Sequence, residues 1–258
     1  MEWLSSGNAT SRPPGARDFR IETGARPVTG AVWLPAEPRA DTALILCGHG
    51  ASGDRYQRPI PHLAARFADA GAATLAIDGP VHGLRQQGPG GRAALAAEIQ
   101  RPSCIDDMVA DWLLALETVR ESARLGGGPL AYFGLSMGTL FGIPLIAAAA
   151  DRGIRLRASV LGLAGTSGAV GFLGERLAGE AARVDHPVLF LMQLEDELFD
   201  RDGYLALFDA LGASDKRLHA NPGLHPEVPS EEVDASVAFI VNRLWADVPR
   251  LITNPLAE

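Results

Sequence analysis

The chain has 258 residues, of which 47% are hydrophobic and 21% charged, and its formal net charge is -8. This composition is typical of a globular protein, and the length suits one large domain that needs no disulfide or metal to hold its core together. An acidic chain without a basic stripe argues against nucleic acid or an anionic membrane as the main partner.

Targeting signals and disulfides are not indicated by the sequence. No stretch of 18 apolar residues is free of charges and helix breakers, so we expect no membrane span. The first residues lack the apolar region of a secretory signal. Cys47 lies in a strand-like run and is expected to be a small buried residue rather than a disulfide partner of Cys104. These features favour a cytoplasmic location.

The N-terminal third predicts an irregular segment followed by alternating strands and helices. Residues 1–16 are polar and rich in Gly, Ser and Pro, so they are expected to be irregular. The runs 19–23 and 28–34 flank a Gly-Ala-Arg-Pro turn and predict an antiparallel hairpin. Further buried strands are expected at 44–47 and 72–77, with a helix at 59–70 that ends at Gly71.

A long helix is predicted from Ser103, with Asp106 as its capping-box partner. Its apolar residues recur with a clean 3.6-residue period: Ile105, Met108, Val109, Trp112, Leu113, Leu116 and Val119. A strand at 130–133 follows, and then a helical segment that Pro144 should bend. The apolar runs 159–163 and 188–194 predict two more strands.

The C-terminal part predicts a helix at 204–211 closed by Gly212, a short strand at 216–219, and a final helix capped by Ser230. The apolar face expected for that last helix comprises Val233, Val237, Ile240, Val241, Leu244 and Trp245. Strands of continuous apolar character separated by helices indicate an α/β fold, a mostly parallel sheet covered by helices on both faces.

We therefore expect one α/β domain over 17–248 and a tail at 249–258. Two connections, 84–102 and 164–183, exceed the usual loop length and could carry short helices. The first is a candidate lip or cap insertion, and both are candidates for lining a mouth over the sheet.

The most informative motif is Gly134-Leu135-Ser136-Met137-Gly138, which reads Gly-x-Ser-x-Gly between an apolar run and a helical segment. A strand that turns sharply into a helix at a serine presents the hydroxyl on an exposed, strained turn. Bulkier residues in place of the two glycines would collide across that turn. Ser136 is therefore a candidate nucleophile.

Partners for Ser136 are expected at the same edge of the sheet, because ligands bind at the carboxyl ends of parallel strands. Asp196 follows the strand at 188–194, and His225 follows the last strand. A serine needs an imidazole to remove its proton, and the imidazole needs a carboxylate to fix its tautomer. The backbone N–H groups of Ala51 and Met137 are the candidate donors to an oxyanion.

Other acids and histidines compete for two of these roles. Glu195, Glu197 and Asp200 are alternatives to Asp196. His49 and His82 lie at the same edge as His225, whereas the remaining histidines are expected to be on a helix, at the wrong end of the sheet or structural: His62, His186 and His219. We favour His225 as the base because proline and glycine flank it in a fixed, projecting turn.

Together these motifs resemble the α/β-hydrolase superfamily, and most of all its compact esterase and dienelactone-hydrolase-like branch. The resemblance rests on His-Gly-x-x-Gly at 49–53, the Gly-x-Ser-x-Gly motif, Glu-Asp-Glu-Leu at 195–198 and Pro-Gly-Leu-His at 222–225, and it covers about residues 28 to 246. It implies the α/β-hydrolase fold with a small or absent lid. The position that the acid takes in the superfamily's order of motifs favours Asp196. Dienelactone hydrolases proper carry cysteine at the elbow, so Ser136 points to ordinary ester hydrolysis.

The resemblance extends to two further histidines. In similar proteins the histidine of His-Gly-x-x-Gly supports the oxyanion loop by hydrogen bonding, which implies that role for His49. The segment 78–83 resembles the superfamily's Asp-x-x-Gly-His-Gly loop, although Val81 replaces its first glycine and leaves the path of the loop open. His82 is expected to be a brace of this loop or a pocket wall.

The sequence thus predicts a serine hydrolase that cleaves small to medium carboxylic esters through an acyl-enzyme intermediate. Alternatives are the same triad acting on a lactone, thioester or C–C bond, and a non-catalytic ligand-binding protein of this fold. The expected partner is a small-molecule ester or lactone. No zinc-ligand spacing and no Gly-x-Gly-x-x-Gly after a strand occur, so no metal or cofactor is expected. Candidate substrate-binding residues are His49, His82, Leu163, Phe172 and Leu173.

Overall fold

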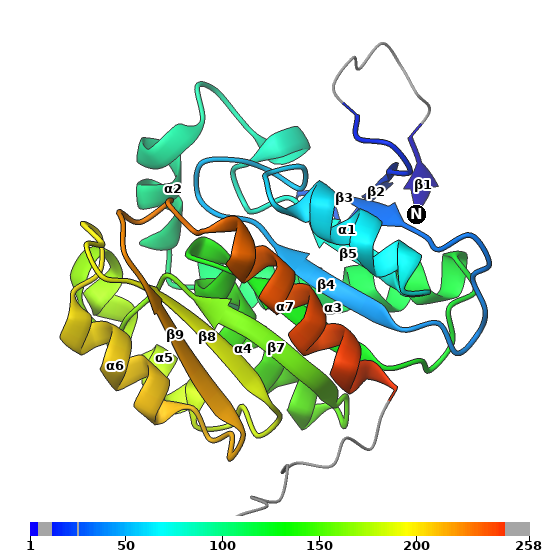
Figure 1. Cartoon of the computed structure of the whole chain (residues 1–258). Helices are drawn as coiled ribbons and strands as arrows, with labels where there is room; N and C mark the ends of the chain where they lie inside the picture. Colours follow the sequence, from blue (N-terminus) through cyan, green and yellow to red (C-terminus); the bar gives the residue numbers. More distant parts are fainter. Residues whose placement is uncertain (5–11, 25, 246–258) are drawn as a thin grey trace, which may run out of the picture.

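A computed structural model describes residues 1–4, 12–24 and 26–245, and within these ranges a nine-stranded sheet forms the centre of the molecule (Figure 1). The strands lie in the order β1-β2-β3-β5-β4-β6-β7-β8-β9. Their bounds are β1 (Glu2–Trp3), β2 (Arg17–Ile21), β3 (Val28–Trp33), β4 (Leu44–Gly48), β5 (Ala73–Ile77), β6 (Leu130–Gly134), β7 (Leu156–Gly162), β8 (Val188–Gln193) and β9 (Lys216–Asn221).

The sheet is mostly parallel, and the predicted fold class is confirmed. Strands β5, β4, β6, β7, β8 and β9 run parallel, while β1, β2 and β3 form an antiparallel edge. The predicted hairpin is present, with Phe19 of β2 opposite Gly30 of β3. Strand β1 pairs with β2, although the first residues were expected to be irregular.

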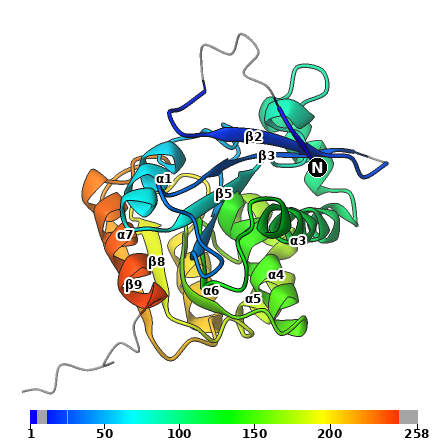
Figure 2. The same ribbon diagram turned by 90° about the vertical axis from the view of Figure 1, so that its right-hand side faces the viewer.

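Helices cover both faces of the sheet (Figure 2). Their bounds are α1 (Ile60–Asp69), α2 (Gly91–Ile99), α3 (Cys104–Ser122), α4 (Met137–Asp151), α5 (Gly174–Ala181), α6 (Arg201–Ala210) and α7 (Ser230–Leu244), with short 3₁₀ helices η1 (Gly83–Arg85) and η2 (Gly168–Leu173). The apolar residues of α1 and α7 pack on one face, and those of α3, α4, α5 and α6 pack on the other.

The central strands are apolar throughout because both of their faces are covered. Every residue of β4, β5 and β6 is buried. On the α3 side, Trp112 meets Tyr132 of β6 edge to face, with ring centroids 6.2 Å apart. Such pairs add to the stabilisation that burial of the two large rings supplies. The continuous apolar runs in the sequence therefore reflect a sheet without a solvent face.

Three predicted helix details are wrong for identifiable reasons. Ser103 is not a side-chain cap of α3, because its backbone already has helical angles and its hydroxyl donates to Asp107. Ser230 is the first residue of α7, after Pro229, and its hydroxyl donates to Glu231. Trp245 follows the end of α7 and is 51% exposed, so it does not belong to the helix's apolar face.

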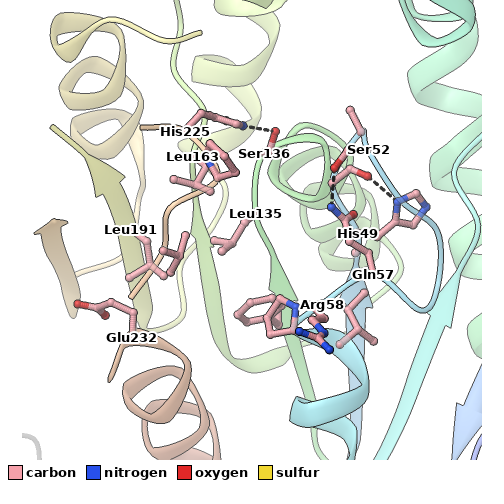
Figure 3. A pocket seen from close by; sticks show the side chains of 18 of the residues that line it. His49, Ser52, Gln57, Arg58, Leu135, Ser136, Leu163, Leu191, His225 and Glu232 are labelled. Atoms are coloured by element: carbon pink, nitrogen blue, oxygen red, sulfur yellow. Dashed lines mark hydrogen bonds between the residues drawn. The ribbon is translucent and has the colours of Figure 1, made fainter. Parts of the chain in front are cut away.

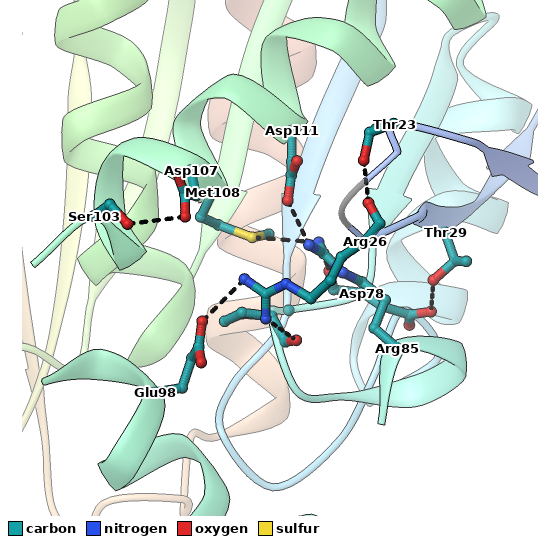
Figure 4. A network of polar contacts seen from close by, with 12 residues as sticks. Thr23, Arg26, Thr29, Asp78, Arg85, Glu98, Ser103, Asp107, Met108 and Asp111 are labelled. Carbon is teal, nitrogen blue, oxygen red and sulfur yellow. Dashed lines mark hydrogen bonds and ion pairs between the residues drawn. The ribbon is translucent and has the colours of Figure 1, made fainter. Parts of the chain in front are cut away.

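The long connection at 84–102 carries α2, and two ion pairs hold it against the body of the domain (Figure 4). Arg26 binds Glu98 of α2 at 3.0 Å. Arg85, which precedes α2, binds Asp111 of α3 at 2.5 Å. The predicted C-terminal tail at 249–258 lies outside the described residues. Within the described ranges, none of the helices has the length and apolarity needed to cross a bilayer.

Candidate active site

Ser136 occupies a strained turn between β6 and α4. Its φ of 56° and ψ of -120° place a residue with a side chain in a region that normally favours glycine. The turn is fixed to β7, because the Ser136 N–H donates to the Gly162 carbonyl at 2.9 Å. The Thr139 hydroxyl lies 2.6 Å from the same carbonyl and accepts the Gly162 N–H at 2.9 Å. Bonds between α4 and β7 thus maintain the strain that projects the serine.

The glycines of the motif are required by close approaches. A Cβ at Gly134 would lie 2.6 Å from the Tyr132 ring, and a Cβ at Gly138 would lie 2.6 Å from the Gly48 carbonyl oxygen. Tyr132 also donates its hydroxyl to the Gly138 carbonyl at 2.6 Å. The start of α4 therefore packs directly on β4 and β6, which leaves no room for a side chain at either position.

The Ser136, His225 and Asp196 side chains form one chain of hydrogen bonds, although they come from three separate loops. The Ser136 hydroxyl lies 2.9 Å from Nε2 of His225 (Figure 3). On the other side of the ring, His225 Nδ1–H donates to Asp196 Oδ2 at 2.7 Å. In this arrangement the imidazole can accept the serine proton while the carboxylate fixes its tautomer.

Asp196 is held as an acceptor by four donors. Its Oδ1 accepts the N–H groups of Leu198 and Phe199 at 2.7 and 3.0 Å, and its Oδ2 accepts the Tyr204 hydroxyl as well as His225. Burial raises the pKa of Asp196, but the hydrogen bonds from Tyr204, His225, Leu198 and Phe199 outweigh it and hold the pKa below its ordinary value. Burial and the bond to Asp196 raise the pKa of Tyr204, so it stays a donor.

The three acids that competed with Asp196 make other contacts. Glu197 accepts the backbone N–H of His225 at 2.9 Å, and Glu195 accepts the backbone N–H of Gly223. Asp200 caps α6 by accepting the Gly203 N–H at 2.8 Å. The two glutamates that flank Asp196 therefore tie the acid loop to the loop that carries the imidazole. No sequence pattern distinguishes these backbone contacts from an ordinary solvated Glu-Asp-Glu run.

The two candidate oxyanion donors lie near Ser136 at the ends of different elements. Met137 begins α4, where the first N–H groups of a helix lack intrahelical acceptors. Ala51 follows β4 in the Gly-rich turn, beside Ser136 in the wall of the same cavity. Among the hydrogen bonds of the described residues, neither N–H has an acceptor. Both are therefore free to bind an anionic oxygen.

Two histidines fix the turn that carries the Ala51 N–H. His49 Nδ1–H donates to the Gly50 carbonyl at 2.8 Å, and this carbonyl shares a peptide unit with the Ala51 N–H. His49 Nε2 accepts the Gly79 N–H at 2.8 Å, which requires a neutral ring. His82 Nε2–H donates to the Ala51 carbonyl at 3.1 Å. Burial lowers the pKa of His49 to about 4 and also lowers the pKa of His82.

The loop at 78–83, whose path the sequence left open, is organised by Asp78. This buried carboxylate accepts the Thr29 hydroxyl at 2.6 Å, the Arg55 guanidinium at 3.0 Å and the Leu84 N–H at 3.1 Å. Gly83 has a φ of +52°, and a Cβ there would lie 2.2 Å from Asp78 Oδ1. The second glycine of the motif is therefore required by Asp78, while Val81 is accommodated.

A cavity of about 470 Å³ opens beside Ser136, and two of the five predicted substrate-binding residues line it. His49 and Leu163 are in its wall. His82, Phe172 and Leu173 are not, for three different reasons. His82 braces Ala51 from behind, Phe172 is 54% exposed on η2, and Leu173 packs against the core on the α5 side. His82 is thus a brace rather than a pocket wall.

Much of the cavity wall comes from segments that sequence reasoning missed. The segment entering α1 and the first turns of α7 both contribute, and so do a leucine directly after β6 and another within β8. The residues concerned are Gln57, Arg58, Pro59, Ile60, Leu135, Leu191, Leu198, Val228, Glu232, Val233 and Ser236. Apart from Leu135 and Leu198, these residues belong to no motif, so only the fold brings them together.

His186 lies away from this site, in the segment before β8, where it packs against β7. It is buried, its Nε2 lies 2.7 Å from the Ser159 hydroxyl, and burial lowers its pKa from 6.5 to about 4. Between these two pH values, His186 therefore binds a proton in the unfolded chain but not in the folded protein. The same holds for His49.

We expect the free energy of unfolding to fall as the pH is lowered from 6.5 towards 4, by up to about 1.4 kcal/mol per pH unit for each of these histidines. Urea unfolding at a series of pH values measures the slope. His186→Asn should reduce it by about one histidine's share, and the exposed His62→Asn serves as the control for the loss of a histidine. An unchanged slope in His186→Asn would contradict the assignment.

Comparison with solved structures finds a similar esterase over nearly the whole chain. A cold-adapted esterase from an Arctic intertidal metagenomic library, solved with bound PEG, is 35% identical, with a TM-score of 0.78, over 95% of this chain and 100% of that one. A native structure of such an esterase is 32% identical, with a TM-score of 0.73 over the same shares of the two chains.

A dienelactone hydrolase from Anabaena variabilis has the same fold at 19% identity and a TM-score of 0.61, over 89% of this chain and 99% of that one. No family model matches the sequence, and no curated protein matches it either.

Proposed function

Because this chain belongs to the α/β-hydrolase superfamily, we propose that it is a serine esterase that cleaves small to medium carboxylic esters through an acyl-enzyme intermediate. The observation that carries this proposal is the chain of hydrogen bonds from Ser136 through His225 to Asp196 beside a cavity. The similarity to solved esterases supports the choice of an ester as the bond that is cleaved.

In the first step, the Ser136 oxygen attacks the ester carbonyl while its proton passes to His225 Nε2. Asp196, whose pKa is held low, stays ionised and stabilises the imidazolium through Nδ1–H. The developing oxyanion is bound by the N–H groups of Ala51 and Met137, which the protein holds in place before the reaction. His225 then donates its proton to the departing alcohol.

In the second step, water replaces the alcohol and hydrolyses the acyl-enzyme. His225 again accepts a proton, this time from water, and returns one to Ser136 as the acid leaves. The same two N–H groups bind the second oxyanion. The backbone hydrogen bonds that Glu195 and Glu197 accept fix the loop of His225, and so keep the imidazole in place through both steps.

A fluorophosphonate probe tests whether Ser136 is an activated nucleophile. The protein is incubated with the probe, and the adduct is mapped by mass spectrometry. We expect labelling at Ser136, no labelling of Ser136→Ala, and normal labelling of Ser103→Ala, whose hydroxyl lies on the surface. Folded wild-type protein without an adduct would favour the non-catalytic ligand-binding alternative.

The size of the substrate is limited by the cavity, and η2 and α5 form no lid that would add binding surface over it. Leu177 and Ala181 of α5 are part of the core, so this connection covers the sheet instead of the site. We expect activity on p-nitrophenyl esters to peak at short or medium acyl chains and to fall before about twelve carbons, because about 470 Å³ holds only a small organic molecule. A steady rise beyond that length would contradict the prediction.

A further inference from the structure

The cavity is polar at its two ends and apolar between them. Ser136 and His225 lie on one side of Leu135, and Arg58 lies on the other (Figure 3). Leucines occupy the wall between these groups, with Phe133, Val228 and Val233 as further apolar lining. A ligand whose reacting carbonyl reaches Ser136 therefore extends past apolar wall towards a guanidinium.

Arg58 is the only arginine or lysine among the cavity-lining residues that the structure describes. In the described ranges it makes no ion pair, and the first turn of α1, which follows it, contains no acidic residue. Its neighbour Arg55 is different, because Arg55 is buried between Asp18 and Asp78. The Arg58 charge is thus not neutralised within its own segment.

The two glutamates of the cavity wall are engaged elsewhere. Glu197 accepts the backbone N–H of His225, at the Ser136 end. Glu232 accepts His219 Nδ1–H at 2.9 Å and lies across the cavity from Arg58 (Figure 3). Each has a donor of its own, so neither carboxylate is the partner of Arg58.

We propose that Arg58 is a specificity-determining residue that selects esters carrying a carboxylate remote from the scissile bond. This inference rests on the proposed esterase function. An ester of this kind places an apolar spacer along the leucines and its free carboxylate at the guanidinium, which offers paired N–H donors for carboxylate oxygens. Because Arg58 is exposed, its effect depends on ionic strength and is realised mainly in KM.

Matched ester pairs test the proposal. Monomethyl adipate and methyl hexanoate differ only in that a carboxylate replaces the terminal methyl group, and methyl aminohexanoate supplies a cation of similar length. Acetoxyhexanoate and hexyl acetate make the same comparison on the alcohol side. Hydrolysis is followed by pH-stat in the wild type, in Arg58→Gln and Arg58→Lys, and in Arg66→Gln, whose arginine is paired with Asp234 outside the cavity.

In at least one pair, we expect the wild type to prefer the anionic ester about tenfold in kcat/KM at low salt, and this preference should shrink towards unity at about 0.5 M salt. Arg58→Gln should lose the preference because its KM rises more for the anionic ester than for the neutral ester. Arg58→Lys should retain part of it, and Arg66→Gln all of it. A wild type that favours the neutral or cationic ester, or an unchanged ratio in Arg58→Gln, would overturn the proposal.

The two proposals fail in different ways. If folded wild-type protein hydrolyses none of these esters, the proposed function is wrong. Arg58 is then tested by calorimetric binding of adipate to the wild type and to Arg58→Gln. Binding that weakens about tenfold in the variant supports anion selection, whereas equal or absent binding overturns it.

Discussion

Replacement of Ser136 by alanine is expected to lower kcat by roughly 10⁴ to 10⁶, because the covalent step is lost while the cavity and the oxyanion donors remain. The loss should appear in kcat rather than KM, since the hydroxyl acts on the reacting carbonyl and leaves the rest of the binding wall unchanged. Steady-state hydrolysis of a short p-nitrophenyl ester measures the effect.

The control for this experiment is Ser103→Ala, which removes a surface hydroxyl at the start of α3. It should hydrolyse the ester at the wild-type rate. Urea unfolding of Ser136→Ala should show a stability equal to or above that of the wild type, because alanine removes no packed group from the elbow. More than a tenth of the wild-type activity in Ser136→Ala would reject its role as nucleophile.

Asp196→Asn is expected to lower kcat by roughly 10³ to 10⁴. All four groups around this side chain are donors, and Oδ1 accepts two backbone N–H groups that cannot move away. The asparagine oxygen should therefore stay with Leu198 and Phe199, which turns its NH₂ group towards His225. His225 would then need to accept at Nδ1 and carry its proton on Nε2, where it cannot receive the proton of Ser136.

Asp200→Asn is the matched control, since Asp200 belongs to the same loop but caps α6. It should reduce stability slightly and leave kcat within a few-fold of the wild type. Activity of Asp196→Asn should recover in part at high pH, where hydroxide takes the Ser136 proton in place of the imidazole. If Asp200→Asn proved the more damaging of the two, the acid would have to be reassigned.

The sheet could be predicted from the sequence because its strands carry a strong signal. Burial on both faces makes β4, β5 and β6 continuously apolar, and helical periodicity separates them from the elements between. Helix starts were less predictable. Serine precedes or begins both α3 and α7, but whether its hydroxyl caps the helix depends on a backbone angle and on the nearby Asp107 and Glu231.

The candidate site divides in the same way. Ser136, Asp196 and His225 could be singled out because each follows a strand at the same edge of the sheet, in an order that the resemblance supports. The residues of the cavity wall could not be singled out in this way. Arg58 and Val233 lie at the starts of two different helices, and they come together only because α1 packs against α7. Phe172 looked suitable by its position in a long loop, yet that loop turns its side chain to solvent.

The placement of the helices has a consequence for how this protein can change. Ser136, the candidate nucleophile, is supported by α4 on one side of the sheet. Helices α1 and α7, which line part of the cavity together with the segments that precede them, pack on the opposite side. Substitutions in those two outer helices can therefore reshape the preference for one ester over another while the strained elbow and its bonds to β7 are left undisturbed. The chemistry and the choice of substrate are free to evolve separately.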